Sequence, residues 1–368
     1  MQQAKKKIII SGGGTGGHIF PAIAIANALK AKLGEVDILF IGAQDKMEME
    51  KVPKAGYPIE GLWISGLQRS LSPKNLSFPF KLISSLRKAG KIIKEFKPDL
   101  VIGVGGFASG PTLYKAAKMG IPTMIQEQNS YPGITNIILS KRVDKICVAY
   151  DNMEKHFPKE KIFLTGNPVR KQVVEIEGKR PRALEFFGLK DDKPVVLVVG
   201  GSLGARTINE AIEANLKTFA AKGIQLIWQT GKGYFPQAKA ALLDLNNDGI
   251  KAYDFITEMD MAYAAADVVV SRAGAIAISE LCVVKKPIIL VPSPFVAEDH
   301  QTKNALALVT YNAATLVKDA EQKEKLMPEI LRLVENEEER AKLIKNITSL
   351  SISDAADAIV GVALTLIK

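Results

Sequence analysis

The residues most suited to chemistry lie near the N-terminus, where a histidine follows a run of glycines. Residues 12–17 read Gly-Gly-Gly-Thr-Gly-Gly, and His18 comes next. Three isoleucines at 8–10 predict a short buried strand, and apolar residues at helical spacing from Ile19 to Lys30 predict a helix with Pro21 in its first turn. A glycine loop between a strand and a helix can bind an anion or a sugar, because loop amides and the positive end of the helix dipole point at the ligand.

An imidazole in the first turn of such a helix is a candidate general base, since it would face whatever the loop binds. The alternative is a histidine that caps the helix or packs against it. The loop also fits the dinucleotide pattern G-x-G-x-x-G through Gly12, Gly14 and Gly17. A nicotinamide-dependent oxidoreductase is therefore an alternative, but it would need an acid at the end of the second strand, where residues 42–44 read Gly-Ala-Gln and Asp45 comes slightly late.

The strand and loop plan recurs along the chain. A strand at 98–104 leads into Gly105 and Gly106, and a strand at 121–125 ends in the polar run 126–129. Residues 195–199 form another strand, followed by a glycine loop and a helix at 207–219. This alternation predicts an α/β fold with two Rossmann-like, doubly wound parallel-sheet domains that face each other across a cleft, with ligands at the carboxyl ends of the strands.

The plan breaks at residues 165–170, Thr-Gly-Asn-Pro-Val-Arg, which predicts the domain junction. Two stretches, 42–69 and 171–193, lack clear periodicity and are expected to be irregular. Residues 352–367 are apolar at helical spacing and predict a last helix that can pack back on the N-terminal domain. The expected parts are an N-terminal domain over 1–165, a C-terminal domain over 166–348 and the C-terminal helix within 349–368.

The C-terminal half carries groups that suit a nucleotide. Ser202, the amides that follow it and the next helix dipole could neutralise a diphosphate, although a serine here could equally cap the helix. Glu280 lies about two turns beyond a helix entry at 271–274, where its carboxylate could bind ribose hydroxyls; the alternative is a surface glutamate. Residues 298–304 add donors and acceptors for a sugar. The chain has no Walker-type phosphate motif and no metal-ligand spacing, so no metal and no cofactor is expected.

The net charge of +10 is unevenly placed. Residues 1–165 contain 24 basic and 13 acidic side chains and the remainder contains 25 and 26, so the N-terminal half should meet an acidic partner. Within it, residues 69–97 mix many cations with phenylalanines, and Glu95 is the only acid there. The mixture favours an anionic membrane surface over nucleic acid, and the alternative is a solvated helix with an inward apolar face. The residues predicted to meet the membrane are Phe78, Phe80, Lys81, Leu82 and Arg87.

Three features bear on location. No apolar run approaches the roughly 18 residues of a spanning helix. The start of the chain, with lysines at 5–7 before only three isoleucines, does not resemble a signal peptide. Cys147 and Cys282 lie in apolar strings that are typical of buried, reduced thiols. We therefore expect a protein that stays in the cytoplasm, either soluble or peripheral on a membrane.

Seven motifs follow one another in the order 12–18, 105–111, 127–129, 166–170, 200–206, 279–280 and 299–302. Together they closely resemble the MurG family, bacterial N-acetylglucosaminyltransferases of the GT-B superfamily, over essentially the whole chain. The resemblance implies the two-domain GT-B fold and an inverting, metal-independent transfer from UDP-GlcNAc. The implied acceptor is the C4 hydroxyl of undecaprenyl-diphosphate-MurNAc-pentapeptide, lipid I, which becomes lipid II in peptidoglycan synthesis. The implied location is peripheral, on the cytoplasmic face of the cell membrane.

The resemblance also implies roles at matching positions. His18 is the implied base, with Glu127 as the alternate. Ser202 would bind the phosphates, Glu280 the ribose and the Ile256 backbone the uracil. The implied acceptor residues are Gly13, Gly14, Gly105, Gly106 and Phe107. The implied donor residues are Thr15, Gly16, Gly17, Asn129, Arg170, Ser202, Ile256, Ala275, Ile276, Ala277, Ile278, Ser279, Glu280 and Gln301, the last of these at the GlcNAc hydroxyls.

Two positions depart from the family pattern. Phe107 stands where tyrosine is frequent, so a hydroxyl is absent there, and Gln126 stands where some members have histidine, so that position offers no imidazole base. Related alternatives are another glycolipid glycosyltransferase, such as a galactosyltransferase, and a non-catalytic adaptor that binds a nucleotide sugar or a lipid. Proteins of cell-wall synthesis or division are candidate partners.

Overall fold

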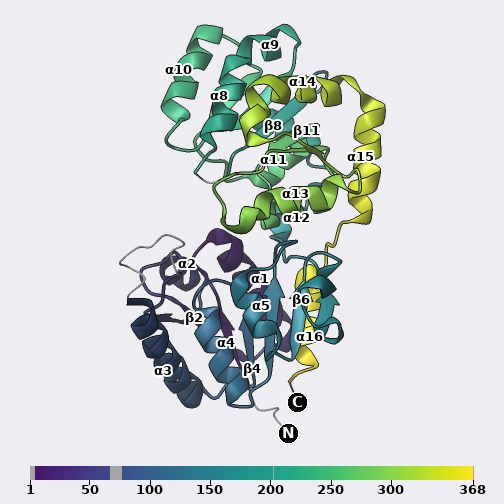
Figure 1. Ribbon diagram of the computed structural model, residues 1–368. Coiled ribbons are helices and arrows are strands. Elements are labelled where there is room, and N and C mark those ends of the chain that lie inside the picture. The colour runs from purple at the N-terminus through teal and green to yellow at the C-terminus, as the bar shows by residue number, and fades with distance from the viewer. Residues whose placement is uncertain (1–4, 67–76, 202, 368) are drawn as a thin grey trace. The chain divides into compact units, whose positions relative to one another are not determined.

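The computed structural model describes residues 5–66, 77–201 and 203–367 (Figure 1). The chain divides into two compact units. The first comprises Met1–Pro168 together with Asp354–Lys368, and the second comprises Val169–Ser353. The chain therefore returns to the first unit at its end.

The sheet of the first unit has seven strands in its described residues, in the order β3-β2-β1-β4-β5-β6-β7, and all neighbouring strands are parallel. The direction of winding changes between β1 and β4, and the carboxyl ends of strands at such a switch point are where open α/β sheets bind ligands. Both glycine loops of this unit follow these two strands. The strands are β1 (Lys6–Ser11), β2 (Val36–Ala43), β3 (Ile59–Leu62), β4 (Leu100–Gly103), β5 (Thr123–Glu127), β6 (Lys145–Val148) and β7 (Ile162–Leu164).

Helices cover both faces of this sheet, as its fully buried isoleucine strand requires. Ile8 and Ile10 pack with α1 and α16, whereas Ile9 points to the other face and packs with α3, α4 and α5. Figure 1 shows α3 and α4 side by side, as their contacts require. The helices are α1 (Gly16–Leu33), α2 (Glu48–Lys54), α3 (Phe78–Phe96), α4 (Ser109–Lys118), α5 (Ile134–Ser140) and α16 (Ala355–Leu364), with short 3-10 turns at Met153–Lys155 and Lys159–Lys161.

The second unit repeats the plan with a six-stranded parallel sheet in its described residues, in the order β10-β9-β8-β11-β12-β13. Its switch point lies between β8 and β11. The strands are β8 (Val195–Val199), β9 (Gln225–Gln229), β10 (Ile250–Tyr253), β11 (Val268–Ser271), β12 (Ile288–Leu290) and β13 (Thr315–Leu316).

The helices of the second unit include a group that packs on one face of this sheet through a buried cluster around Trp228 and Phe219. That group is α8 (Arg206–Ala214), α9 (Leu216–Ala221), α10 (Phe235–Leu245), α14 (Gln322–Glu335) and α15 (Glu337–Ser349). The others are α6 (Lys171–Val174), α7 (Arg180–Phe187), α11 (Met259–Ala265), α12 (Ala275–Val284) and α13 (His300–Val309), with 3-10 turns at Ala297–Asp299 and Asp319–Glu321. The prediction of two Rossmann-like, doubly wound parallel sheets is confirmed.

Several local predictions were wrong. The stretch 42–69 contains α2 and β3, and 171–193 contains α6 and α7, because elements of four to eight residues are too short to show periodicity. The helix expected over 207–219 is two helices, broken at Asn215, whose side-chain amide donates to the Ala211 carbonyl. The first helix begins at Gly16 rather than Ile19, so Pro21 lies inside it.

The last helix, α16, belongs to the core of the first unit. Ile359, Val360 and Ala363 are buried in the cluster that contains Ile8 and Ile25. The side chain of Ile359 is fully buried. Its contacts join residues more than 300 positions apart in sequence, so α16 is a structural part of a unit built otherwise from the N-terminal half.

We expect Ile359→Ala to lower the free energy of unfolding of the first unit by about 2–5 kcal/mol, because it removes buried methyl groups and leaves a cavity. Hydrogen exchange measured by mass spectrometry should show faster exchange in β1 and β6 peptides, with little change in β8 and β9. Thr365→Ser, at the exposed end of the same helix, is the matched control. Unchanged exchange in β1 and β6 would contradict this placement of α16.

Candidate active site

The two glycine loops of the first unit touch each other through their backbones. A Cβ atom placed on Gly106 would lie 2.3 Å from the Gly13 carbonyl oxygen, and one placed on Gly12 would lie 2.3 Å from the Val104 side chain. Gly106 also has φ of +85°, which disfavours any other residue. The structure therefore brings together Gly13, Gly105 and Gly106, which the sequence predicted as one acceptor-binding group.

His18 lies against this pair of loops. Its Nδ1 is 3.1 Å from the Gly13 carbonyl oxygen and 3.4 Å from the Thr15 hydroxyl. A carbonyl oxygen can only accept, so this hydrogen bond requires a proton on Nδ1 and leaves the lone pair on Nε2. A Cβ on Gly105 would lie 2.9 Å from Nε2, so a glycine at this position keeps space beside that atom. This geometry suits a general base.

The first turn of α1 supplies three more predicted residues. Thr15 is the N-cap with extended backbone, and Gly16 and Gly17 are the first helical residues. Pro21 has no N–H, so the Gly17 carbonyl lacks its usual helical donor. The amide of Gly14, in contrast, donates to the Glu48 carboxylate at 2.8 Å, so a ligand would not meet this N–H.

Glu127, the alternate base, is buried and fully engaged by its own loop. One carboxylate oxygen accepts from the Asn129 backbone and side chain at 3.0 and 3.1 Å. The other accepts from the Gly133 amide at 3.0 Å and from Asn136 at 2.8 Å. These bonds shape the loop between β5 and α5, and a carboxylate held so completely is poorly placed to take a proton from a ligand.

Gln126 is fully buried beneath the site. Its amide donates to the Asn167 side chain at 2.9 Å, and Asn167 donates in turn to the Gln128 carbonyl at 3.0 Å. Gln128 also donates to the Val104 carbonyl at 3.0 Å. The network ties the end of β5 to the loop after β4 and to the last residues before the unit boundary. Phe107, the other departure from the family pattern, is 44% exposed, and its ring closely faces Gly66.

In the second unit, two residues predicted separately for the donor meet. Glu280, on α12, is 4% exposed, and one of its oxygens accepts from Arg170 Nε at 3.1 Å and Nη2 at 3.0 Å. Burial raises the pKa of Glu280 above its ordinary value of 4.5, and Arg170 and the buried Tyr263 hydroxyl partly oppose this shift. Burial, together with Glu280, raises the pKa of Tyr263. The carboxylate is therefore buried and hydrogen-bonded to Arg170, at the position where the resemblance implies a ribose.

The remaining predicted donor residues surround the start of α12, whose first residues are Ala275, Ile276, Ala277 and Ile278. Gln301 accepts from the Ala273 amide at 3.2 Å and from the Ser293 amide at 2.8 Å, so its carbonyl fixes the loops before α12 and after β12. Ser279 donates back to the Ala275 carbonyl at 3.0 Å. Ser202 lies outside the described residues.

The backbone of Ile256, predicted to meet the uracil, is partly engaged already. Its amide donates to the Gln229 side chain at 2.9 Å in a buried position. Gln229 lies at the end of β9 and also donates to the Gly201 carbonyl at 3.1 Å. Gln229 therefore positions both the Ile256 loop and the glycine loop after β8.

Arg272 is a candidate site residue that the sequence analysis missed. Its guanidinium donates to the Thr207 hydroxyl and the Val291 carbonyl, both at 3.0 Å, and pairs with Asp319. Thr207 donates to the same carboxylate at 2.8 Å. The cluster joins the start of α8, where the sequence predicts diphosphate binding, to the start of α12 and to the loop after β12. Since Asp319 lies 47 positions away, no local pattern could reveal the pair.

Glu48 is the second missed residue. It lies in the first turn of α2, within the stretch that was expected to be irregular. Its side chain is buried, and it accepts from the Gly14 amide and from the Ala43 amide at 2.9 Å. An acid in a short helix carried no sequence signal for a role under the glycine loop.

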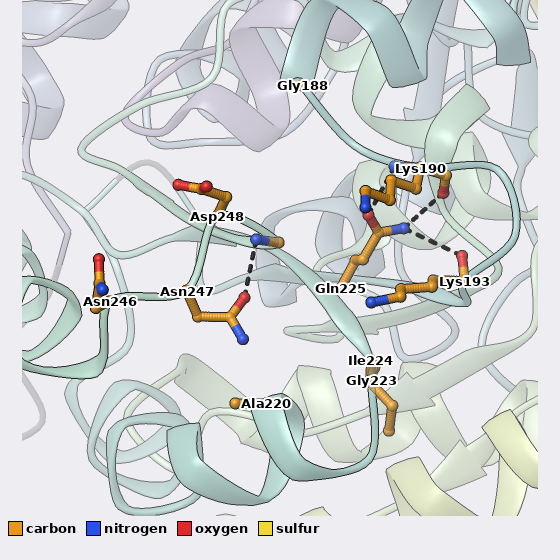
Figure 2. Close-up of a pocket in the computed structure, with 11 residues that line it drawn as sticks. Gly188, Lys190, Lys193, Ala220, Gly223, Ile224, Gln225, Asn246, Asn247 and Asp248 are labelled. Atoms are coloured by element: carbon orange, nitrogen blue, oxygen red, sulfur yellow. Dashed lines mark hydrogen bonds between the residues drawn. The ribbon is translucent and has the colours of Figure 1, made fainter.

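A cavity of about 290 Å³ lies elsewhere in the second unit (Figure 2). Its lining includes Lys190, Lys193 and Gln225, and Gln225 donates to the carbonyls of both lysines. The cavity lies at the amino ends of β8, β9 and β10, opposite the loops described above. It is therefore separate from the candidate donor site. Within the described ranges, no three His, Cys, Asp or Glu side chains gather as metal ligands.

The residues predicted for the membrane divide between two faces of α3. Phe80 is 69% exposed and Ile83 48%, and Arg87 is exposed on the same side. Phe78 and Leu82 instead pack against the core cluster, and Lys81 donates to Ser65 and lies over the Trp63 ring. None of the helices described here is both long enough and apolar enough to cross a bilayer.

Two parallel α/β units with ligand loops at their switch points are the architecture of GT-B glycosyltransferases. The chain belongs to glycosyltransferase family 28: residues 8–148 match the family's N-terminal domain and residues 195–359 match its C-terminal domain. The predicted MurG-family resemblance is confirmed by relatives and by a solved structure.

Among the relatives is the UDP-N-acetylglucosamine--N-acetylmuramyl-(pentapeptide) pyrophosphoryl-undecaprenol N-acetylglucosamine transferase of Cytophaga hutchinsonii, which is 56% identical over 100% of this chain and 98% of its own length. The protein of the same name from Parabacteroides distasonis is 54% identical over 97% of each chain. The crystal structure of Acinetobacter baumannii MurG is similar with a TM-score of 0.80 and 26% identity, covering 98% of this chain and 99% of that one.

We expect Glu280→Gln to weaken UDP binding by about 1.5–3 kcal/mol, because a charge-assisted hydrogen bond to the ribose is lost. In the parent, affinity should fall with decreasing pH as Glu280 is protonated, and this loss should begin above pH 4.5 because burial raises the pKa. The variant should lack that pH dependence. Calorimetry with UDP and 2′-deoxy-UDP measures both effects, and the exposed Glu258→Gln is the control. An equal loss for the two ligands would exclude a ribose contact.

Proposed function

We propose that the protein transfers N-acetylglucosamine from UDP-GlcNAc to the C4 hydroxyl of undecaprenyl-diphosphate-linked MurNAc-pentapeptide, with inversion at the anomeric carbon. The observation that carries this proposal is the name shared by relatives that are more than half identical over nearly the full chain. The arrangement of side chains around both glycine loops supports the same chemistry.

The proposed reaction is a single displacement. Nε2 of His18 takes the proton from the acceptor hydroxyl while its oxygen bonds to the anomeric carbon. The bond from that carbon to the diphosphate breaks, and its electron pair leaves with UDP. A base on one side and an anion-binding group on the other are the two things that this step requires.

In the second unit, the chain would bind the donor through its two helix starts and Glu280. Backbone amides at the starts of α8 and α12 would stabilise the negative charge that develops on UDP. Arg272 would hold these two starts in place. Arg170 offsets the Glu280 charge in the structure described here, and it would contact the donor when the ribose binds.

The nicotinamide-dependent alternative is disfavoured by the end of β2. The strand ends at Ala43 and an amide, Gln44, follows where the acid would be needed. Asp45 comes one residue later, exposed in a turn with φ of +58°. The nearest buried acid, Glu48, is committed to the amides of Ala43 and Gly14.

We expect His18→Ala to lower turnover by about a hundredfold or more, with UDP affinity nearly unchanged, because the loss falls on proton transfer. The assay uses radiolabelled UDP-GlcNAc and a water-soluble, short-chain lipid I analogue. His156→Ala, in the same unit with its ring against Tyr131, is the control. Turnover within a few-fold of the parent would show that His18 is structural and would return Glu127 as the candidate base.

We propose further that the enzyme acts as a peripheral protein on the cytoplasmic face of the membrane, with α3 of the first unit against the lipid. The support is the exposed face of α3, where Phe80 and Ile83 precede Arg87, Lys91 and Lys94 at helical spacing. Apolar side chains beside cations suit an anionic interface, where each cation contributes about 1 kcal/mol.

A triple variant, Phe80→Ser, Ile83→Ser and Arg87→Glu, should sharply reduce flotation with anionic vesicles, because it removes both inserted side chains and one cation. Activity on a bilayer-embedded acceptor should fall with it, while activity on the short-chain acceptor should survive. The matched control on α10 is Leu243→Ser with Lys239→Glu, which changes an exposed apolar residue and a cation of the second unit. Flotation equal to that of the parent would place the membrane face elsewhere.

A further inference from the structure

Glu48 lies directly beneath the first glycine loop. It is 1% exposed, and both of its oxygens are engaged: one accepts from the Gly14 amide at 2.8 Å and the other from the Ala43 amide at 2.9 Å. A buried acid that accepts with both oxygens has the hydrogen-bonding pattern of an ionised carboxylate. The carboxylate is therefore a buried charge that is hydrogen-bonded to the glycine loop before His18.

Two glycines make the room for this carboxylate. A Cβ on Gly13 would lie 2.2 Å from the Glu48 carboxyl carbon, and one on Gly42 would lie 2.5 Å from its Cγ. The glycine at position 13 is thus explained by Glu48 as well as by the loop's approach to Gly106. The glycine loop and the Glu48 side chain are therefore complementary in shape.

The carboxylate and His18 share a single peptide group. The N–H of the Gly13–Gly14 peptide donates to Glu48, and the carbonyl of the same peptide accepts from His18 Nδ1 at 3.1 Å. A negative charge on the N–H side polarises the peptide and makes its carbonyl oxygen a stronger acceptor, because linked hydrogen bonds strengthen one another. The result favours a proton on Nδ1.

Two further neighbours of the His18 ring are uncharged groups. Thr15 places its hydroxyl 3.4 Å from Nδ1, and Gly105 places its backbone beside Nε2. The nearby acid on β5, Glu127, bonds within its own loop. Glu48 is a charge that reaches the imidazole through the two hydrogen bonds of the Gly13–Gly14 peptide.

We propose that Glu48 is a positioning residue for His18 that acts through the Gly13–Gly14 peptide. It holds the imidazole in the tautomer with the proton on Nδ1, so that the lone pair on Nε2 can accept the proton of the acceptor hydroxyl. It also stabilises the imidazolium that this transfer produces. The activity part of the proposal rests on the proposed role of His18, whereas the tautomer part does not.

The first test is the nitrogen NMR spectrum of the 15N-labelled protein, which has three histidines. The 15N shifts of His18, assigned with His18→Gln, should show the Nδ1–H tautomer in the parent. In Glu48→Gln, which keeps the shape but removes the charge, the Nε2–H tautomer should become appreciable. Glu50→Gln, exposed on the same helix, should leave the spectrum unchanged.

The second test is the pH profile of transfer. Glu48→Gln should lower kcat by about tenfold or more with the KM for UDP-GlcNAc nearly unchanged. The acidic limb of its kcat/KM profile should move to lower pH, because the neutral amide no longer stabilises the imidazolium. Glu48→Asp, which keeps the charge, should restore part of the activity. If Glu48 had only a structural role, the acidic limb of the kcat/KM profile would stay at the pH of the parent.

The outcomes distinguish the proposed positioning role of Glu48 from the proposed base role of His18. An Nε2–H tautomer of His18 in the parent overturns the proposal, even if Glu48→Gln does not fold. An unchanged tautomer and an unchanged acidic limb in a folded Glu48→Gln overturn it as well. Full activity of His18→Ala would instead overturn the base role, whatever the spectrum of Glu48→Gln shows.

Discussion

The close approach of two backbone loops is the constraint on which the first unit's site depends. β1 and β4 are neighbours at the switch point. The hydrogen bonds between them continue to the ends of the strands, where the Val104 amide donates to the Ser11 carbonyl at 2.9 Å. The two loops must then turn away while still in contact, which leaves no room for a Cβ at Gly12 or Gly106. His18 lies against these two loops, since its Nδ1 contacts the Gly13 carbonyl oxygen and its Nε2 lies beside Gly105.

Buried acids hold these loops in shape. Glu48, Glu127 and Glu280 are each at most 4% exposed, and burying a charge is unfavourable unless hydrogen bonds or an opposite charge compensate it. In the first unit the compensation comes from amide groups of Gly14, Ala43 and the loop after β5. In the second unit it comes mainly from the Arg170 guanidinium. Amides that donate to a buried acid hold their loop in one conformation before any ligand binds. Amides that do not donate within the protein can instead bind a ligand's negative charge.

The sequence predicted the repeated strand, loop and helix plan because isoleucine and valine runs next to glycine runs are strong local signals. It placed β8 over the same residues that the structure gives, and it placed His18 beside a glycine loop. It missed α2 and therefore Glu48, because a seven-residue helix has no readable period. It also missed Arg272, since its partners Thr207 and Asp319 come from distant elements. Hydrogen-bond partners of this kind depend on the folded topology, so residue types alone could not identify them.

Gln126 bears on the proposal that His18 is the base. The Gln126 side chain donates to Asn167 and accepts from Gln128 in a buried network. A glutamine amide can do both at once and cannot titrate, so it meets the structural need of this position without offering a base. Family members with histidine here would therefore need a neutral imidazole for the same hydrogen bonds. In this chain the Gln126 side chain holds the end of β5 against the chain near the unit boundary. In the proposed reaction, the proton is therefore taken by a group outside this network.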